Sequence, residues 1–130
     1  MTNPTTAKAS IATAMFSVSD QDAALTFYTG QLGWEVRADV RFGADGENRW
    51  VEVAPPGSVA RLALNPPMGG TPGGAAIGVE VDDVLAEHAR LTGAGVNDLD
   101  PAPQHIEGAP LMFSLRDPDG NAIWVVSPAG

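Results

Sequence analysis

Four ionisable side chains of this 130-residue sequence could take part in acid–base chemistry or ligand binding: Glu52, Glu80, His88 and His105. Each glutamate stands between two valines, and in a strand this alternation puts the carboxylate on the face opposite to its apolar neighbours. If the valines pack against helices, both carboxylates face a concave surface, where they could act as acids and bases or bind hydroxyl or cationic groups. We expect His88, in a helical pattern, to be a solvated surface residue. His105 follows several prolines, and it either reaches the mouth of the concavity or is ordinary polar surface.

The same alternation predicts which other side chains share the concave face. Trp50 has the parity of Glu52, and Trp124 takes the corresponding place in the last strand-like segment. Aromatic rings and adaptable methionines suit a flat, largely apolar molecule that a few polar groups orient. In the alternative interpretation, these large side chains fill the concavity or form a subunit interface. The predicted ligand-binding residues are Met15, Trp50, Glu52, Arg61, Glu80, His105, Met112, Ser114 and Trp124.

Composition excludes several classes of chemistry and partner. The chain has no cysteine, so a cysteine nucleophile, a thiolate metal ligand and a disulfide are ruled out, and we expect a cytoplasmic location. Sixteen acidic residues against seven basic ones give a net charge of −9, which repels nucleic-acid backbones and anionic membranes. The apolar stretches are shorter than the ~20 residues that a membrane span needs. We therefore expect neither nucleic acid nor membrane as a partner.

The predicted elements come in the same order in both halves of the chain. In the first half a strand at 11–18 and a helix at 21–32 precede strands at 34–41, 48–54 and 59–65. Prolines and glycines at 66–74 then indicate a linker. In the second half a strand at 75–81 and a helix at 84–92 precede strands at 96–99, 110–116 and 121–127. The sequence thus predicts an internal repeat.

A short alignment supports the repeat. The residues FSVSD (16–20) and VEVDD (79–83) have apolar, polar, apolar, polar and acidic positions in the same order. In each half the acidic residue can cap the helix that follows, and Gly33 in the first half or Gly93 and Gly95 in the second can end it. We also expect the segment Asp117–Asn121 (DPDGN) to form a tight hairpin turn, and Phe27-Tyr28 to pack the helix.

Three segments of the chain resemble one known family. The stretches VSDQDAALTFYTGQLGW (18–34), RWVEVAPPG (49–57) and RDPDGNAIWVV (116–126) are similar to segments of the vicinal-oxygen-chelate superfamily. That superfamily contains glyoxalases, bleomycin-resistance proteins and extradiol dioxygenases. The resemblance implies an α+β fold of two tandem βαβββ modules that form a curved mixed-sheet cup with helices on its outer face. It also implies one domain over residues 1–130, with module one at 11–65, the linker at 66–74 and module two at 75–128.

The resemblance also implies four positions for ligands of a divalent metal. They fall on Thr13, Ala63, Ala76 and Trp124. Methyl groups and an indole offer a metal no usable lone pair, and a single threonine hydroxyl is too weak a ligand alone. The sequence therefore predicts a cup without a metal or other cofactor.

These observations favour a binding protein over an enzyme and leave the choice open. We expect a protein of the bleomycin-resistance type that sequesters an aromatic or polycyclic antibiotic or small metabolite and confers resistance by stoichiometric binding. The resemblance implies a homodimer. The main alternative is a lyase, isomerase or dioxygenase of the glyoxalase type, either metal-independent or with metal ligands at other positions. A third possibility is a module that acts through protein contacts alone.

Overall fold

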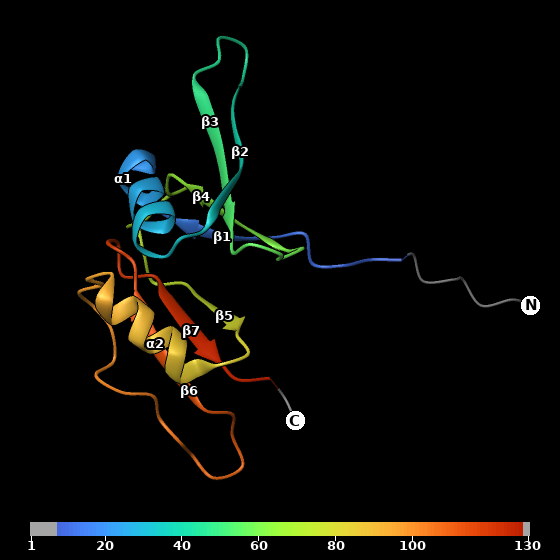
Figure 1. Ribbon diagram of the computed structural model, residues 1–130. Coiled ribbons are helices and arrows are strands. Elements are labelled where there is room, and N and C mark those ends of the chain that lie inside the picture. The colour runs from blue at the N-terminus through green and yellow to red at the C-terminus, as the bar shows by residue number, and fades with distance from the viewer. Residues whose placement is uncertain (1–7, 129–130) are drawn as a thin grey trace, which may run out of the picture.

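Two β-sheets, each packed on a helix, make up the chain in the computed structural model, which describes residues 8–128 (Figure 1). The first half contains β1 (Thr13–Ser17), α1 (Gln21–Leu25), η1 (Thr26–Gln31), β2 (Glu35–Phe42), β3 (Asn48–Ala54) and β4 (Arg61–Asn65). The second half contains β5 (Ala76–Glu80), α2 (Val84–Gly93), β6 (Met112–Arg116) and β7 (Ala122–Val126). This confirms the predicted α+β class. No helix among the described residues is long and apolar enough to cross a membrane.

The two sheets have the same arrangement of their first and last strands. The four-stranded sheet has the order β1-β4-β3-β2, and the three-stranded sheet has the order β5-β7-β6. In each sheet the first strand of the module pairs in parallel with its last strand, and the remaining neighbours are antiparallel. As a result β1 and β5 are both edge strands.

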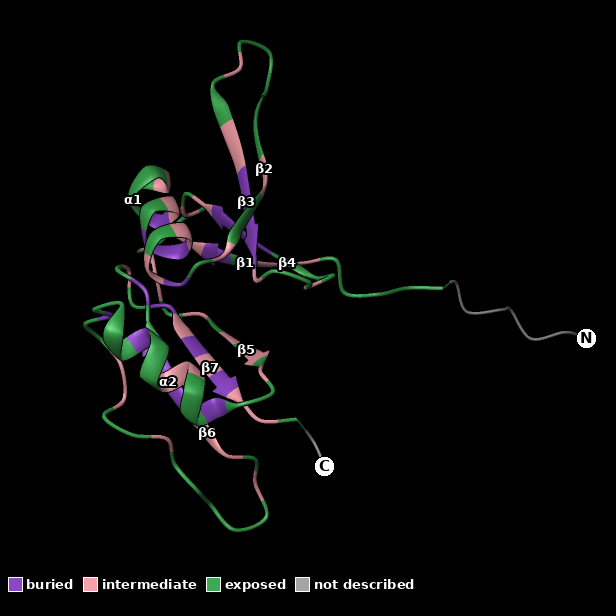
Figure 2. Ribbon diagram, viewed as in Figure 1, coloured by how far each residue is buried: buried purple, intermediate pink, exposed green. Residues whose placement is uncertain are grey.

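The prediction of a strand at 96–99 is wrong. Only an isolated antiparallel bridge joins Leu99 to Leu115, so the second module lacks a regular counterpart of β2. The backbone next to the bridge still pairs, because Arg116 N donates to Asp98 O at 2.9 Å and Asp100 N donates to Ser114 O at 3.0 Å. The loop that follows carries the chain away from the sheet, and most of its residues are exposed (Figure 2).

The first helix changes its winding part-way along. Asp20 caps it, as predicted, by accepting a hydrogen bond from Ala23 N at 3.0 Å. Instead of one α-helix over 21–32, the chain forms α1 and then the π-helical turn η1. In that turn the Thr29 hydroxyl donates to the Leu25 carbonyl at 2.7 Å. In a regular α-helix the backbone N–H of Thr29 would donate to the same carbonyl, so the hydroxyl competes with it. The wider turn buries both Phe27 and Tyr28.

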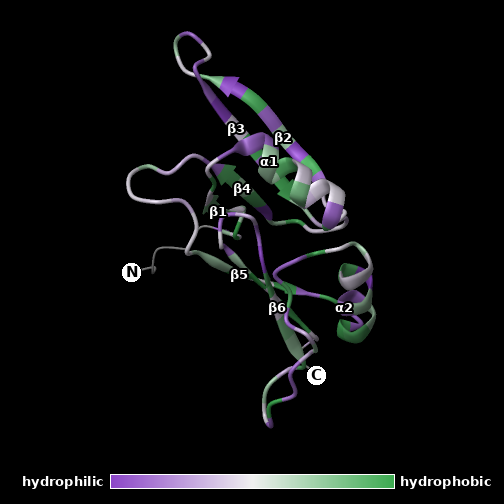
Figure 3. Ribbon diagram, turned by 90° about the vertical axis from the view of Figure 1, so that its left-hand side faces the viewer, coloured by the Kyte–Doolittle hydropathy of each residue, from purple (hydrophilic) through white to green (hydrophobic). Residues whose placement is uncertain are grey.

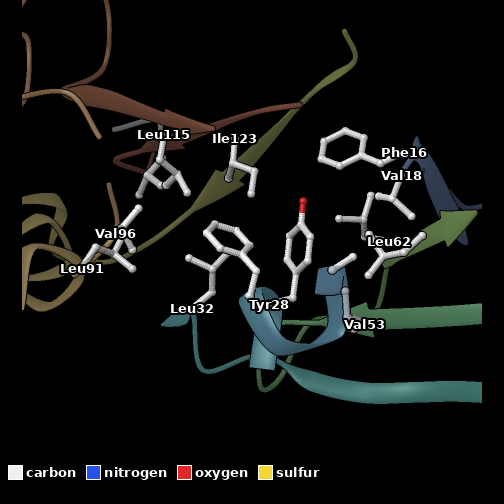
Figure 4. Close-up of a cluster of buried hydrophobic side chains, with 14 of the residues drawn as sticks. Phe16, Val18, Tyr28, Leu32, Val53, Leu62, Leu91, Val96, Leu115 and Ile123 are labelled. Atoms are coloured by element: carbon white, nitrogen blue, oxygen red, sulfur yellow. The ribbon is translucent and has the colours of Figure 1, made fainter. Parts of the chain in front are cut away.

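A continuous core joins the two sheets. Figure 4 shows the Tyr28 ring between side chains of the four-stranded sheet, such as Phe16, and side chains of the three-stranded sheet, such as Ile123. All three of these residues are at most 1% exposed. The expectation that Phe27 and Tyr28 serve helix packing is confirmed, since Phe27 is also buried.

The turn at 117–121 is a tight turn, as expected, and it also connects the modules. The Asp117 carboxylate accepts from the Tyr28 hydroxyl at 2.9 Å and from Asn121 Nδ2 at 3.0 Å. Asn121, which is fully buried, also donates to Ser17 O at 3.0 Å and accepts from Ala75 N at 3.2 Å. Buried polar groups require such partners, so this turn holds β1, η1 and the start of β5 together.

The β2–β3 hairpin extends away from the rest of the chain (Figures 1 and 2). Hydropathy alternates along β2, as expected for a strand with two different faces (Figure 3). Val40 is 54% exposed and Phe42 49% exposed, and they pair across the sheet with Trp50 and Asn48. The hairpin therefore presents apolar side chains on the same face as Trp50.

Candidate functional site

The first group of predicted ligand residues lies on one face of the four-stranded sheet. Backbone pairing sets Met15 beside Ala63 and Ala63 beside Glu52, while Arg61 pairs with Thr13. We call this surface the first-sheet face and define it by Met15, Trp50, Glu52 and Arg61. Met15 is 63% exposed, whereas Glu52 is buried.

The Glu52 carboxylate has two partners on this face. The Thr13 hydroxyl donates to Oε2 at 3.0 Å, and Arg61 Nη1 donates to Oε1 at 3.2 Å. Glu52 is 5% exposed, and a carboxylate at that depth is costly without such partners. Glu52 is therefore a fixed counter-charge for Arg61 and not a free base.

The second group lies on one face of the three-stranded sheet. Trp124 on β7 pairs with Gly78 on one side and Ser114 on the other, and Met112 and Glu80 occupy the neighbouring pairs with Val126. We call this surface the second-sheet face and define it by Glu80, Met112, Ser114 and Trp124. No strand pairing joins the two sheets within the described residues, so the two faces belong to separate sheets.

The structure gives the surroundings of Ser114, His88 and His105, for which the sequence offered only expectations. Asp100 Oδ2 accepts from Ser114 N at 2.8 Å and from its hydroxyl at 3.1 Å, so this polar group already has a partner. The surface position predicted for His88 is wrong. Its Nε2 lies 2.7 Å from Asp100 O, and its ring packs edge-on against Phe113 with 5.0 Å between centroids. His105 is exposed in the loop after Asp100.

A hollow of the described chain lies elsewhere, between the edges of the two sheets. We call it the inter-sheet cleft. Its volume is about 670 Å³, and β1, β4, β5 and the loop after β3 form its walls. Of the nine predicted ligand residues, only Arg61 and Glu80 line it. The full lining is Ile11, Ala14, Trp34, Pro55, Pro56, Gly57, Ser58, Ala60, Arg61, Leu62, Ile77, Gly78, Val79 and Glu80.

Trp34 supplies the aromatic surface of the cleft. Its backbone N–H donates to Tyr28 O at 2.9 Å, and its ring lies 5.3 Å from the Tyr28 ring. The core therefore orients this tryptophan. The sequence did not predict this position because Trp34 directly follows the glycine that ends the helix. At that point neither the periodicity of a helix nor the alternation of a strand indicates which way a side chain points.

Arg37 braces the loop that forms one wall. It donates to Ser58 O at 2.9 Å and to Pro55 O at 3.1 Å, while the Ser58 hydroxyl donates to Ala60 O at 2.6 Å. Two prolines restrict the same loop further, since their φ angles are fixed. Pro55, Pro56 and Gly57 of this loop belong to the RWVEVAPPG segment, which is the sequence signal that could have indicated the cleft.

The four positions that the family pattern reserves for metal ligands do not fit a divalent cation. The Thr13 hydroxyl donates to Glu52, Ala63 is fully buried, and Ala76 and Trp124 offer no lone pair. Nowhere in residues 8–128 do three His, Asp or Glu side chains gather as a metal site would require. These four positions therefore offer no site for a catalytic metal ion.

Comparison with known proteins identifies the family. Residues 10–125 match the profile of the Glyoxalase/Bleomycin resistance protein/Dioxygenase superfamily, and the chain belongs to this superfamily. It is 32% identical over 114 residues to the uncharacterized protein YetH of Bacillus subtilis (strain 168), a match that covers 85% of this chain and 92% of YetH.

Two crystal structures share the fold closely. The antibiotic binding protein TnmS3 from Streptomyces sp. CB03234 is 32% identical, with a TM-score of 0.81 over 96% of this chain and 100% of TnmS3. A superfamily member from Sphaerobacter thermophilus DSM 20745 is 31% identical, with a TM-score of 0.80 over 93% of this chain and 98% of the other.

Proposed function

We propose that this protein binds and sequesters a flat aromatic antibiotic or small metabolite in the inter-sheet cleft, without changing it chemically. The observation that carries the proposal is the cleft itself. It is half-open, its walls are mostly apolar, and its volume of about 670 Å³ lies within the range of small-molecule sites. The description of TnmS3 as an antibiotic binding protein supports the same class of function.

The walls suit a planar ring system. Trp34 is held in place by its contact with Tyr28, so an aromatic ligand can stack on it without first ordering the side chain. The braced loop at 55–60 limits the reorganisation that binding requires. Only Arg61 and Glu80 contribute charge to the cleft. Binding would lower the free concentration of the compound stoichiometrically, as resistance by sequestration requires.

We also propose that the protein acts as a homodimer in the cytoplasm. Among the described residues the edge strands β1 and β5 each have a strand partner on one side only, and a second copy could pair β1 of one chain with β5 of the other. That pairing would set the first-sheet face of one chain beside the second-sheet face of its partner. The predicted cup with Trp50 and Trp124 would then form only between chains. Light scattering measures the mass directly, and a monomer would contradict this part of the proposal.

Tryptophan fluorescence tests the function and its location together. The three tryptophans Trp34, Trp50 and Trp124 allow a set of single Trp→Phe variants, each titrated with a panel of aromatic antibiotics and metabolites. For binding in the inter-sheet cleft, we expect saturable quenching that Trp34→Phe removes and the other two variants keep. If Trp50→Phe or Trp124→Phe removes the signal instead, the ligand binds on the sheet faces. No quenching across the panel would contradict the proposal.

Mass analysis of the recovered ligand separates sequestration from catalysis. An unchanged mass at one ligand per site supports a binding protein. A new mass with repeated turnover would make the protein an enzyme and would redirect attention to Glu80, because Glu52 is already paired with Thr13 and Arg61.

A further inference from the structure

One charged side chain connects the first-sheet face with the inter-sheet cleft. Arg61 begins β4, lines the cleft, and has a side chain that is 49% exposed. Its Nη1 donates to the Glu52 carboxylate at 3.2 Å, and the Thr13 hydroxyl holds the other oxygen of that carboxylate at 3.0 Å. A chain of contacts from Thr13 through Glu52 therefore orients the guanidinium.

Arg61 keeps donors for a further partner. A guanidinium has five N–H donors in a rigid plane, and the described contacts of Arg61 use only Nη1. Glu52 is too deeply buried to turn toward the cleft, since its side chain is 6% exposed. In this arrangement the carboxylate positions the arginine, and among the described lining residues Arg61 is the charged side chain on the wall formed by β1 and β4.

The opposite wall adds one carboxylate. Glu80 comes from β5, and it forms no ion pair with Arg61 among the described side chains, so the guanidinium is not neutralised across the cleft. The side chains between these two charges are mostly apolar, with Trp34 as the aromatic group. Arg61 is therefore the charged hydrogen-bond donor that these walls offer to an acceptor group of a bound aromatic molecule.

We infer that Arg61, positioned by Glu52 and Thr13, selects aromatic ligands that carry a hydrogen-bond acceptor such as a carboxylate, sulfonate or carbonyl oxygen. This inference rests on the proposed function, because it requires a ligand in the inter-sheet cleft. Charge-assisted hydrogen bonds to a planar guanidinium favour such oxygens. The net charge of −9 opposes anions at long range, so a preference for an anionic ligand has to come from a local donor.

Two fluorescent probes that share one ring system test the inference. 8-Anilino-1-naphthalenesulfonate and N-phenyl-1-naphthylamine differ by one sulfonate group, and both brighten on entering an apolar site. At fixed ionic strength we expect the protein to bind the sulfonate at least about tenfold more tightly, the scale of one charge-assisted hydrogen bond. Arg61→Gln should bring the ratio of the two dissociation constants close to one, and Arg61→Lys should keep part of the preference.

A positioning variant and a control complete the design. Glu52→Gln removes the counter-charge but keeps an oxygen that accepts from Arg61 Nη1, so it should increase the preference for the sulfonate and leave the affinity of the uncharged probe unchanged, which a purely structural role would not do. Arg41→Gln removes the same charge from an exposed site on β2 and should leave the ratio as in the native protein. Since Arg61→Gln leaves Glu52 without its counter-charge, the double variant Glu52→Gln/Arg61→Gln is measured as well, and a thermal melt checks each fold.

The outcomes separate the two ideas. Binding of both probes with a preference that the Arg61 variants reduce, that Glu52→Gln increases and that Arg41→Gln leaves unchanged supports the inference. Binding of both probes with a ratio that the Arg61 variants do not alter, or that Arg41→Gln alters equally, overturns the inference and leaves the cleft as a binding site. If neither probe binds the native protein, the proposed function is overturned as well.

Discussion

Removing the Tyr28 hydroxyl should weaken the connection between the two modules. Tyr28 is fully buried, and its hydroxyl donates to Asp117 Oδ2 at 2.9 Å across 89 residues of sequence. In Tyr28→Phe the ring packing stays the same, so the loss is confined to one hydrogen bond to a buried carboxylate, about 1.5–3 kcal/mol. Asp117 keeps its bonds from Asp119 N and from both nitrogens of Asn121, which places the expected loss at the lower end, about 1.5–2 kcal/mol.

Thermal unfolding measures this loss. For a chain of this length, 1 kcal/mol corresponds to roughly 3–5 °C in Tm, so Tyr28→Phe should lower Tm by about 5–10 °C. An unchanged Tm would refute the view that this hydrogen bond joins the modules.

Alkaline titration provides an independent measurement on the same side chain. Burial and the charge of Asp117 raise the pKa of Tyr28 well above its ordinary value of about 10. Because the folded pKa is raised, its contribution to stability is fully present below pH about 10 and is lost as the pH rises further, since the unfolded chain then releases the proton more readily. The protein should therefore unfold at high pH, and Tyr28→Phe should remove this part of the pH dependence.

Tyr28 is the only tyrosine of the chain, so phenolate absorbance reports on it alone. We expect no phenolate signal near pH 10 in the folded protein, and then a signal that rises together with the loss of circular dichroism. A phenolate that forms near pH 10 while the circular dichroism is still native would refute the reasoning.

Two further predictions concern a glycine in a close backbone contact and the N-cap of α2. Gly73 has φ +88°, and a Cβ there would overlap the backbone oxygen of Asp119, whereas Gly74 has φ +86° and open space. Gly73→Ala should thus cost about 2–4 kcal/mol in a denaturant melt and Gly74→Ala only about 1–2 kcal/mol, and equal losses would contradict the close approach. Asp83 caps α2 by accepting from the N–H three residues later at 3.0 Å, so Asp83→Ala should cost about 1 kcal/mol. The exposed Asp82→Ala is the control, and an equal effect would show that charge and not capping matters.

Much of the fold could be predicted because it depends on local chemistry. The cap at Asp20, the end of the helix at Gly33 and the tight turn after Asp117 all depend on residues that are neighbours in sequence. The strand at 48–54 was predicted to the residue, since its alternation is regular. The strand at 96–99 failed because its pairing is reduced to a bridge at Leu99, which local propensity cannot reveal.

The candidate site was harder to predict. Parity correctly placed Trp50 with Glu52 on one sheet and Trp124 with Ser114 on the other. Their role as ligand contacts stays a prediction, as do the module boundaries around the linker at 66–74. Parity within a strand says nothing about which strands from different sheets come close together, and this is why the cleft between β1, β4 and β5 was missed.

The sequence by itself determined the repeat, the caps, the turns and the poor metal ligands at Thr13, Ala63, Ala76 and Trp124, because these depend on residue type and short spacing. Only the tertiary structure decided the partners of the buried polar groups. Glu52 meets Thr13 across 39 residues. The cleft lined by Trp34 and Arg61 likewise exists only where two sheets meet. Contacts of that separation depend on how the whole chain packs, which no local pattern encodes.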